Sequence, residues 1–309
     1  MKVHRDIDNL PAFRNAVITI GTFDGVHQGH RQIIDKLRSE AKAVNGESVI
    51  ITFHPHPRKV VSSTILGIRL INTLDEKIEL LGSLGIDHLV IVPFTDAFAN
   101  QPAEDYVKDF LADKFHPHTI IIGYDHRFGK ERKGDYLLLE KLAPTYKYRI
   151  LEIPKHVLDE ISISSTKIRE SLLEGKIDVA DKLLGYEFFF SGVVVHGDKL
   201  GRKLGYPTAN LKVLDEEKIT PGNGIYAVYA LPDGFKERCK GMMSIGFRPT
   251  VDGKKRVIEV NIFDFDKEIY DESLKVYVKK YLREELKFNG LDELVEQIGK
   301  DKIESLKCL

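Results

Sequence analysis

The arrangement of short apolar runs constrains the fold of this chain more than any other feature of its sequence. In the first half of the chain, fully apolar runs alternate with segments that have helical apolar spacing. Such alternation predicts an α/β fold, in which a parallel sheet is covered by helices on both faces. The expected strands are residues 17–20, 48–53, 88–93, 119–123 and 148–152, and the expected helices are residues 29–44, 74–84 and 106–114.

The pattern changes after about Phe188. Strand-like runs rich in Val, Ile, Tyr and Phe then follow one another, separated by Gly, Pro and Asp: FFFSGVVVHG, GIYAVYAL, GMMSIGF, VIEVNIFDF and LKVYVKKYL. Close succession of such strands predicts an antiparallel barrel or sandwich, and helical spacing at residues 291–306 predicts a closing helix. A length of 309 residues favours two domains, and two short expected helices (167–173 and 179–184) place their boundary between residues 1–184 and 185–309.

Composition excludes several classes of protein. The 46 basic and 47 acidic residues nearly cancel, so nothing marks the chain as a binder of nucleic acid or of a membrane surface. Only two cysteines occur, without a CxxC pair, and the N-terminal residues lack the apolar core of a signal peptide. No apolar run approaches the roughly 18 residues that a membrane span needs. We therefore expect a cytoplasmic protein without nucleic-acid or membrane partners, and self-association is left open.

The segment GTFDGVHQGHRQIID, residues 21–35, combines an expected strand end, a glycine-bearing turn and an expected helix start. In parallel α/β sheets, ligands bind at this carboxyl edge of the strands. A helix N-terminus favours anions, and His27 and His30 would add hydrogen-bond donors for phosphate oxygens. Gly21 and Gly25 would let the backbone approach a ligand closely.

Two roles besides phosphate binding stay open for these histidines. Helix capping or simple surface exposure accounts for many HxxH pairs. A structural zinc site needs about four ligands, and the further histidine pairs, His54 with His56 and His116 with His118, are interrupted by prolines. Zinc is therefore the less favoured alternative.

The segment GTFDGVHQGH resembles the signature of the HxGH nucleotidyltransferase superfamily, in its flavin-nucleotide branch. Histidines of that signature contact nucleotide phosphates in the family. A second signature, S-S/T-x-x-R, is matched within ISISSTKIRE, where serine and threonine are also good helix caps. The resemblance implies a Rossmann-like domain with His27 and His30 as catalytic residues. It implies ATP and phosphate contacts by Gly21, Phe23, Asp24, Gly25, His27, His30, Ser164, Ser165, Thr166 and Arg169.

Two further segments resemble the same branch. TFHPHPRKVV is similar to a proline-stiffened loop that borders the flavin, which implies flavin contacts by Pro55 and Pro57. IIIGYDHRFGKERKGD resembles a G-x-D-F-x-F-G element, which implies flavin contacts by Asp125 and Phe128. Core packing is the alternative for Phe128. His126 replaces the first Phe of that element, so no flavin-stacking role is assigned to it.

In the second half, HGDKLGRKLGYPTANL resembles the G-x-GRxLG-[FY]-PTAN motif of riboflavin kinases. Glycine-rich backbone in such a loop can bind phosphates through its N–H groups. The resemblance implies that Thr208 and Asn210 help to hold Mg²⁺ with ATP. It implies ATP and phosphate contacts by Gly197, Gly201, Lys203, Gly205, Pro207, Thr208 and Asn210.

Three more segments, PGNGIYAV, SIGFRPTV and VIEVNIFDFDKEIY, are similar to further elements of riboflavin kinases. The last of them implies a catalytic role for Glu259, for which a solvated charge on an alternating strand is the alternative. YLREELKF resembles a segment near the flavin and implies a flavin contact by Arg283. Ser244 and Asn261 depart from the family pattern, where Asn and His respectively are frequent.

Two lookalike motifs are rejected. GYDHRFGKE has one residue too many between its glycines for a P-loop, and Glu131 replaces the required Ser or Thr. GNGIYA fits a dinucleotide-binding fingerprint, but it opens strand-like alternation where that fingerprint needs a helix.

The resemblance covers about residues 15–305 and indicates the bacterial family of bifunctional riboflavin kinase/FMN adenylyltransferases, the FAD synthetases. It implies ATP-dependent phosphorylation of riboflavin to FMN and adenylylation of FMN to FAD, with ATP as co-substrate and FMN and FAD as substrate or product. Two other classes stay open. A single-function nucleotidyltransferase would share the HxGH pattern without needing the PTAN domain, and a flavin-binding regulator would keep the fold with inactive sites.

Overall fold

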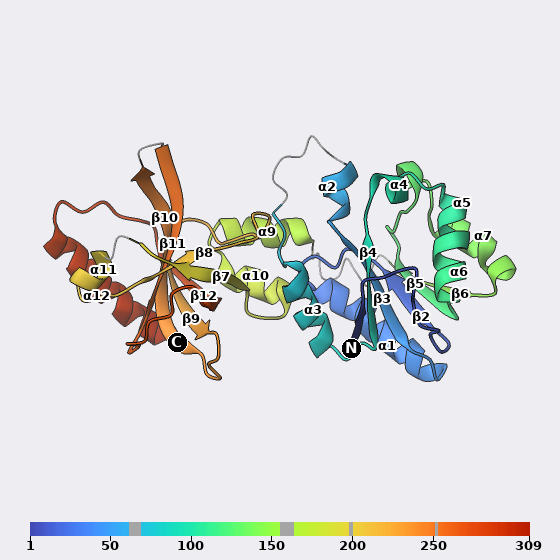
Figure 1. Cartoon of the computed structure of the whole chain (residues 1–309), viewed down its shortest axis with the longest axis horizontal. Coiled ribbons are helices and arrows are strands. Elements are labelled where there is room, and N and C mark those ends of the chain that lie inside the picture. The colour runs from blue at the N-terminus through green and yellow to red at the C-terminus, as the bar shows by residue number, and fades with distance from the viewer. Residues whose placement is uncertain (62–68, 155–163, 198–199, 251–252) are drawn as a thin grey trace. The chain divides into compact units, whose positions relative to one another are not determined.

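The computed structural model describes residues 1–61, 69–154, 164–197, 200–250 and 253–309. The chain forms two compact units, Met1–Ser165 and Thr166–Leu309, which Figure 1 shows in blue to green and in yellow to red. This division falls inside the ISISSTKIRE motif, before the boundary predicted at residue 184, which stays a prediction. Residues 161–163, 198–199 and 251 of the motifs above lie outside the described residues.

The first unit is built on a six-stranded sheet whose paired strands are all parallel. Its strand order is β1-β4-β3-β2-β5-β6, and its strands are β1 (Lys2–His4), β2 (Val17–Ile20), β3 (Ser48–His54), β4 (His88–Pro93), β5 (Thr119–Gly123) and β6 (Arg149–Ile153). The predicted parallel α/β fold is therefore confirmed. Strand β1 was not predicted, because its three residues are mostly exposed and carry no apolar pattern.

Helices of this unit cover both faces of the sheet (Figure 1). They are α1 (Gln28–Ala43), α2 (Pro57–Val61), α3 (Leu74–Ser83), α4 (Asp96–Ala99), α5 (Ala103–Asp105), the π-helix η1 (Tyr106–Ala112), α6 (Asp113–Phe115), the 3₁₀ helix η2 (Lys130–Arg132) and α7 (Tyr136–Tyr146). The helix predicted at residues 106–114 corresponds to η1 and the start of α6. Helix α7 was not predicted, and it contains Pro144, which lowers the helical propensity of its sequence.

Alternating strand residues supply the two hydrophobic layers, because successive side chains of a strand point to opposite faces. On one face, Ile18, Ile51, Val90 and Ile120 pack in a core with the aromatic residues of the segment from Tyr106 to Phe115. Helix α1 buries its own apolar stripe against β2, β3 and β5. Burial on both faces explains the continuous apolar runs of these strands.

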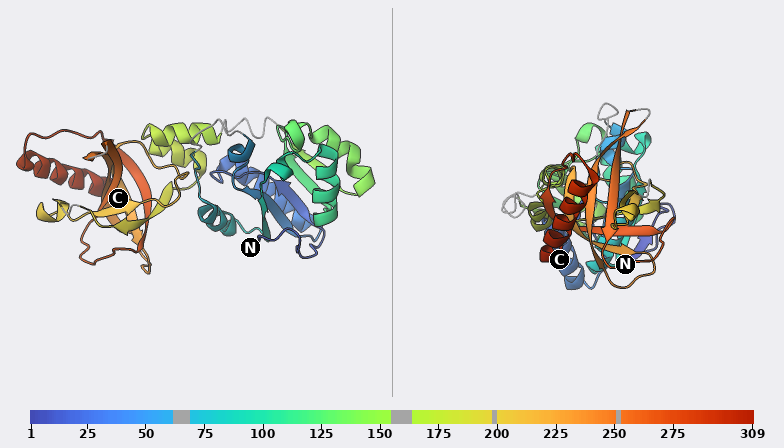
Figure 2. Two further views of the ribbon diagram at one scale, coloured as in Figure 1. Left: turned by 45° about the horizontal axis from the view of Figure 1, so that its top comes forward. Right: turned by 90° about the vertical axis from the view of Figure 1, so that its left-hand side faces the viewer.

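The second unit is a closed barrel of six antiparallel strands in the order β10-β11-β8-β7-β12-β9. The strands are β7 (Phe189–Val195), β8 (Ala209–Lys212), β9 (Gly224–Pro232), β10 (Cys239–Thr250), β11 (Gly253–Ile262) and β12 (Ser273–Arg283). Helix α12 (Leu291–Cys308) packs against β9, β10 and β12, and it is the red helix of Figure 2. The predicted barrel and its closing helix are confirmed.

The short helices α9 (Ser165–Leu173) and α10 (Ile177–Leu184) are fastened to this barrel. The Gly222 N–H donates to the carbonyl oxygen of Leu172 at 3.0 Å, and the Phe188 N–H donates to Asp181 Oδ1 at 2.8 Å. A Cβ at Gly175 would lie 2.8 Å from the ring of Tyr281. These contacts explain why both helices belong to the second compact unit. Helix α11 (Leu200–Lys203) lies in the glycine-rich loop before β8.

Candidate active sites

The turn after β2 has an uncommon backbone conformation. Phe23, Gly25 and Val26 have positive φ angles of 47°, 92° and 39°, a region that is costly for residues with side chains. A Cβ at Gly25 would lie 3.0 Å from Ile71 Cδ1, and a Cβ at Gly21 would lie 3.1 Å from the Phe23 ring. The ring of Phe23 is buried and lies beside Gly21, so it supports the turn. Phosphate contact by Phe23 and by the two glycines stays a prediction.

His27 and His30 form a stacked pair at the start of α1. Their ring centroids are 3.6 Å apart with an interplanar angle of 13°. His27 is the N-cap of the helix, and its Nδ1 accepts a hydrogen bond from the His30 N–H at 3.4 Å. His27 therefore caps the helix, and this leaves phosphate binding open, since a cap and a ligand contact can coexist.

His30 is held in its neutral form. Burial, and then the charges of His27 and Lys77, keep the pKa of His30 well below its usual range. Its Nδ1 atom is buried without a hydrogen-bond partner. A buried ring nitrogen with an unused hydrogen bond is uncommon. This nitrogen therefore has hydrogen-bonding capacity that no residue contact in the described part of the chain uses.

A hydrogen bond between Asp24 and Ser165 connects the two predicted signature segments. The buried Asp24 carboxylate accepts hydrogen bonds from the N–H groups of Ile71 at 2.9 Å and Asn72 at 3.4 Å. The Ser165 hydroxyl donates to the Asp24 carbonyl oxygen at 3.0 Å. Asp24 thus has a bracing role in the turn, and its predicted phosphate contact stays a prediction.

The other members of the second signature lie close in sequence. Ser164 is exposed immediately before α9, while Thr166 and Arg169 lie on α9 within the second compact unit. The expected contacts of these residues with ATP phosphates stay predictions.

Sequence reasoning missed Lys77. The Lys77 side chain on α3 is buried, and its Nζ donates to the carbonyl oxygen of Thr22 at 2.7 Å. Burial lowers the pKa of Lys77, while the charge of Asp24 opposes this shift. A signal was present in the helical spacing, since Lys77 lies three residues before Leu80 and four before Leu81, on the buried face of α3.

The candidate flavin residues of the first unit follow two strands that flank β2. Pro55 and Pro57 come after β3, and Asp125 is exposed in the loop after β5. Because β3 and β5 are the neighbours of β2 in the sheet, these loops share the carboxyl edge with the histidine turn. Phe128 is buried and stacks on Tyr106 with ring centroids 4.9 Å apart, so core packing alone explains its position. Its flavin contact stays a prediction.

The structure shows the surroundings of His126, the residue that departs from the pattern of the similar element. Burial lowers the pKa of His126 to about 4, although the charge of Asp125 opposes the shift. Its Nε2 atom is buried without a hydrogen-bond partner. The loop therefore carries a neutral imidazole at this position.

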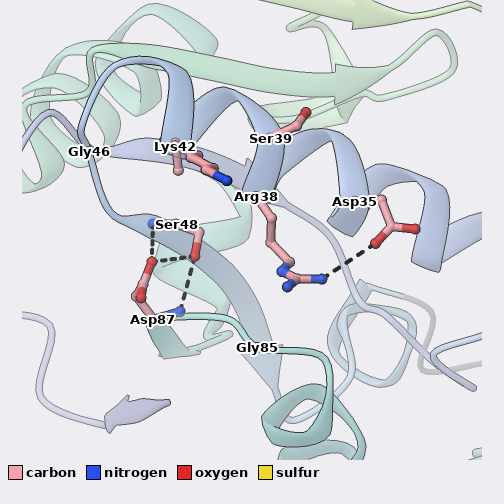
Figure 3. Close-up of a pocket in the computed structure, with 9 residues that line it drawn as sticks. Asp35, Arg38, Ser39, Lys42, Gly46, Ser48, Gly85 and Asp87 are labelled. Carbon is pink, nitrogen blue, oxygen red and sulfur yellow. Dashed lines mark hydrogen bonds and ion pairs between the residues drawn. The ribbon is translucent and has the colours of Figure 1, made fainter.

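A cleft of about 450 Å³ lies at the opposite edge of the sheet from the histidine turn. Figure 3 shows it between α1, which carries Arg38 and Lys42, and the segments that lead into β3 and β4. Ser48 and Asp87 at its base are joined by hydrogen bonds, including Ser48 Oγ to Asp87 Oδ2 at 2.7 Å. The cleft contains no predicted site residue, and it lies at the amino ends of these strands.

The second unit gathers the predicted kinase residues on neighbouring strands. Glu259 on β11 pairs in register with Asn210 on β8, and Thr208 precedes β8. The Thr208 hydroxyl donates to Glu259 Oε1 at 3.4 Å, and the Arg248 guanidinium forms an ion pair with Glu259 Oε2. The Glu259 side chain is only 16% exposed, which excludes a freely solvated strand charge. Sequence reasoning did not single out Arg248, although it lies in the SIGFRPTV segment.

The glycine-rich loop before β8 is closely packed. A Cβ at Gly197 would lie 2.2 Å from Asn210 Nδ2, and a Cβ at Gly201 would lie 2.3 Å from the carbonyl oxygen of Tyr206. Gly205 has a φ angle of +81°. Backbone sterics therefore require glycine at Gly201, and the positive φ angle favours it at Gly205, whereas a side chain at Gly197 would displace the Asn210 amide. The exposed Lys203 ends α11, and its phosphate contact stays a prediction.

A cleft of about 70 Å³ includes Pro207 and Thr208. The carbonyl oxygen of Pro207 accepts a hydrogen bond from Asn261 Nδ2 at 2.6 Å, which gives that departure from the family pattern a supporting role. Ser244, the other departure, lies opposite Glu259 in the β10–β11 register.

The donor set beside Glu259 fits a magnesium ion. Thr208, Asn210 and Glu259 offer hydroxyl, amide and carboxylate oxygens, the ligand type that Mg²⁺ prefers. The same ion usually keeps several waters and binds substrate phosphates, so a few protein oxygens suffice.

Arg283 anchors the closing helix. Its Nε and Nη2 atoms donate to the two carboxylate oxygens of Asp301 on α12 at 2.8 and 2.6 Å. Asp301 is buried and also accepts from Gln297 Nε2 at 2.9 Å. The bidentate pair fixes the guanidinium, and the expected flavin contact of Arg283 stays a prediction.

Comparison with known proteins matches both units. The family model for FAD synthetase matches residues 10–167, and that for riboflavin kinase matches residues 184–309. A bifunctional riboflavin kinase/FMN adenylyltransferase of Buchnera aphidicola subsp. Schizaphis graminum is 39% identical over 305 residues, covering 97% of this chain and 96% of the relative. The protein of the same name from Escherichia coli (strain K12) is 36% identical and covers 98% and 96%.

A solved structure supports the architecture of the whole chain. A protein from Streptococcus pneumoniae, named as a macrolide-efflux protein, superposes with a TM-score of 0.85 at 29% identity over 97% of each chain. Within the described residues of the present chain, no helix is long and apolar enough to cross a membrane. The near-complete coverage by relatives and the two family models lead to one conclusion: this chain belongs to the bifunctional riboflavin kinase/FMN adenylyltransferase family.

Proposed function

We propose that this chain converts riboflavin to FAD in two ATP-dependent reactions, one in each unit. The second unit transfers the γ-phosphoryl group of ATP to the 5′-hydroxyl of riboflavin and gives FMN. The first unit joins FMN to the AMP part of ATP and releases pyrophosphate. The observation that carries the proposal is the chemical difference between the two sites, a stacked histidine pair with a neutral His30 in one and a carboxylate with hydroxyl and amide oxygens in the other.

In adenylyl transfer, an oxygen of the FMN phosphate attacks the α-phosphorus of ATP, and the bond to the β-phosphate oxygen breaks. A phosphate monoester is mostly ionised at neutral pH, so no protein base is needed to activate it. His27 and His30 would donate hydrogen bonds to phosphate oxygens at the N-terminus of α1, where backbone N–H groups also favour an anion. The turn residues and the S-S-T-x-x-R residues are proposed to complete the ATP site.

In the kinase reaction, the nucleophile is an alcohol and must lose its proton as the new P–O bond forms. We assign that proton to Glu259, which the β-sheet holds in a fixed direction beside Thr208. Mg²⁺, when bound, supplies positive charge that screens the ATP phosphates. Thr208 and Asn210 would hold it, and the glycine-rich loop would bind the phosphates.

The functional domains are proposed to meet at Leu184 and Gly185, with α9 and α10 as supports for the barrel. Cytoplasmic location is also proposed. Cys239 and Cys308 are unpaired thiols, which fits a reducing compartment.

Incubating the purified protein with riboflavin and Mg-ATP, and separating the flavins over time, tests the proposal. FMN followed by FAD is the expected result. FAD formed only from added FMN would instead support a single-function nucleotidyltransferase. Tight flavin binding without turnover would support a flavin-binding regulator.

A further inference from the structure

Lys77 is a buried cation that the mechanism above does not use. Only 7% of its surface is exposed, and its Nζ atom donates to the Thr22 carbonyl oxygen at 2.7 Å. A capping box formed by Thr73 and Glu76 fixes the start of its helix, α3. Burying an ammonium group is unfavourable unless it gains strong partners. The chain thus buries a lysine, at an energetic cost, in contact with the turn that precedes α1.

The turn itself needs external support. Two of its non-glycine residues, Phe23 and Val26, have positive φ angles, and such conformations persist only when the surroundings enforce them. Several contacts from outside the turn hold it. Lys77 and the Thr52 hydroxyl both donate to the Thr22 carbonyl. Ile71 and Asn72 donate to the Asp24 carboxylate, and Ser165 donates to the Asp24 carbonyl. The contact from Lys77 also brings a positive charge.

That charge acts on the histidine pair. His27, on the same helix as His30, and Lys77, on α3, are the titratable groups whose charges act on the His30 imidazole. The ring of Phe23 packs against His30, with ring centroids 5.0 Å apart. Positive charge close to the turn favours the binding of an anion there.

We propose that Lys77 is a positioning residue of the adenylyl-transfer site: its ammonium group holds the turn from Thr22 to Val26 in the shape that receives the phosphates of ATP. Lys77 acts through the Thr22 carbonyl and through His30, without touching the substrate. The inference rests on the proposed adenylyl transfer at this turn.

The test compares Lys77→Met with Lys108→Met in the full-length chain. Methionine matches lysine in length but carries no charge, and Lys108, 58% exposed on η1, provides the same chemical change outside the turn. The imidazole of His30 is titrated by NMR without nucleotide, and the rate of FAD formation is measured from FMN and Mg-ATP. Lys77→Met should raise the pKa of His30 and lower kcat/KM for ATP by roughly 10²-fold, the scale for a displaced reacting group.

Lys108→Met should leave both readouts at the wild-type values. A second variant, Lys77→Gln, keeps a hydrogen-bond donor but removes the charge, so it serves if Lys77→Met does not fold. It should raise the pKa of His30 in the same direction.

The proposal is overturned if a folded Lys77 variant leaves the His30 titration unchanged and FAD formation within about threefold of wild type. It is also overturned if Lys108→Met gives the same changes as Lys77→Met. Wild-type chain that makes no FAD from FMN would count against the proposed adenylyl transfer itself, while the NMR titration would still decide whether Lys77 controls His30.

Discussion

The candidate sites of the two units are built from different chemical groups. In the first unit, the turn after β2 presents a stacked histidine pair, with a neutral His30, at a helix N-terminus. In the second unit, Glu259 sits on a rigid strand with its carboxylate in contact with Thr208 and Arg248. Under the proposed function, the nucleophiles account for this difference, since an ionised phosphate needs only charge stabilisation, whereas an alcohol needs a proton acceptor.

The largest effect is expected at the carboxylate. Glu259→Gln keeps the size of the side chain but removes the basic oxygen and the charge that pairs with Arg248, so FMN formation from riboflavin should fall by about 10²–10⁴. FAD formation from FMN should stay at the wild-type rate. Both rates are measured by separating the flavin products. Normal FMN formation by this variant would return Glu259 to a structural role and leave the alcohol without an identified base.

The next largest effect is expected at the histidine pair. His30→Ala should lower FAD formation from FMN by roughly 10²–10³, the scale for loss of one positioned transition-state donor. The same protein should convert riboflavin to FMN normally, which serves as its internal control. An unchanged rate of FAD formation would show that His30 is only part of the helix start.

A third prediction concerns stability rather than chemistry. Arg283→Ala leaves the buried carboxylate of Asp301 without its bidentate partner, which should cost on the order of 3 kcal/mol of unfolding free energy. The loss should appear in thermal unfolding of the second unit and spare FAD formation from FMN. If stability is unchanged while the KM for riboflavin rises, Arg283 serves the flavin and the anchoring account is wrong.

The smallest effect is a pH dependence in the first unit. The pKa of His126 is about 4 in the folded chain against about 6.5 when unfolded, so the unfolded state takes up the proton first as pH falls. This contribution to stability should therefore be fully present above pH 6.5 and be lost as pH falls from about 6.5 towards 4, with a loss of about 2 kcal/mol at pH 5.

His126→Phe, which replaces the titrating imidazole by an apolar ring, should flatten this dependence. Urea unfolding of the full chain at pH 7.5 and pH 5 measures it. An equal drop in wild type and variant would contradict the assignment to His126.

The strands and helices that were predicted correctly are those whose apolar residues repeat in a regular pattern. Strands 88–93 and 119–123 were predicted with the observed bounds, because both faces are buried and the apolar runs are continuous. Helix α7 was missed because Pro144 interrupts its helical pattern. Strand β1 was missed because it is short and mostly exposed.

The motifs singled out candidate site residues but not the groups that contact them. The motifs indicated His30 and Glu259, whose positions follow from a turn and a strand. Lys77 and Arg248 act from other elements, and their contacts with Thr22 and Glu259 arise only on folding. Helical spacing could have placed Lys77 on the buried face of α3, but its contact with Thr22 leaves no local pattern in the sequence.

Mixing the two single variants tests most directly whether the sites are separate and chemically distinct. With riboflavin and Mg-ATP, Glu259→Gln alone should form little FMN, and His30→Ala alone should accumulate FMN without FAD. Together they should produce FAD, because FMN released by the second protein is the substrate of the first. A mixture that forms no more FAD than the two variants do separately would contradict the account.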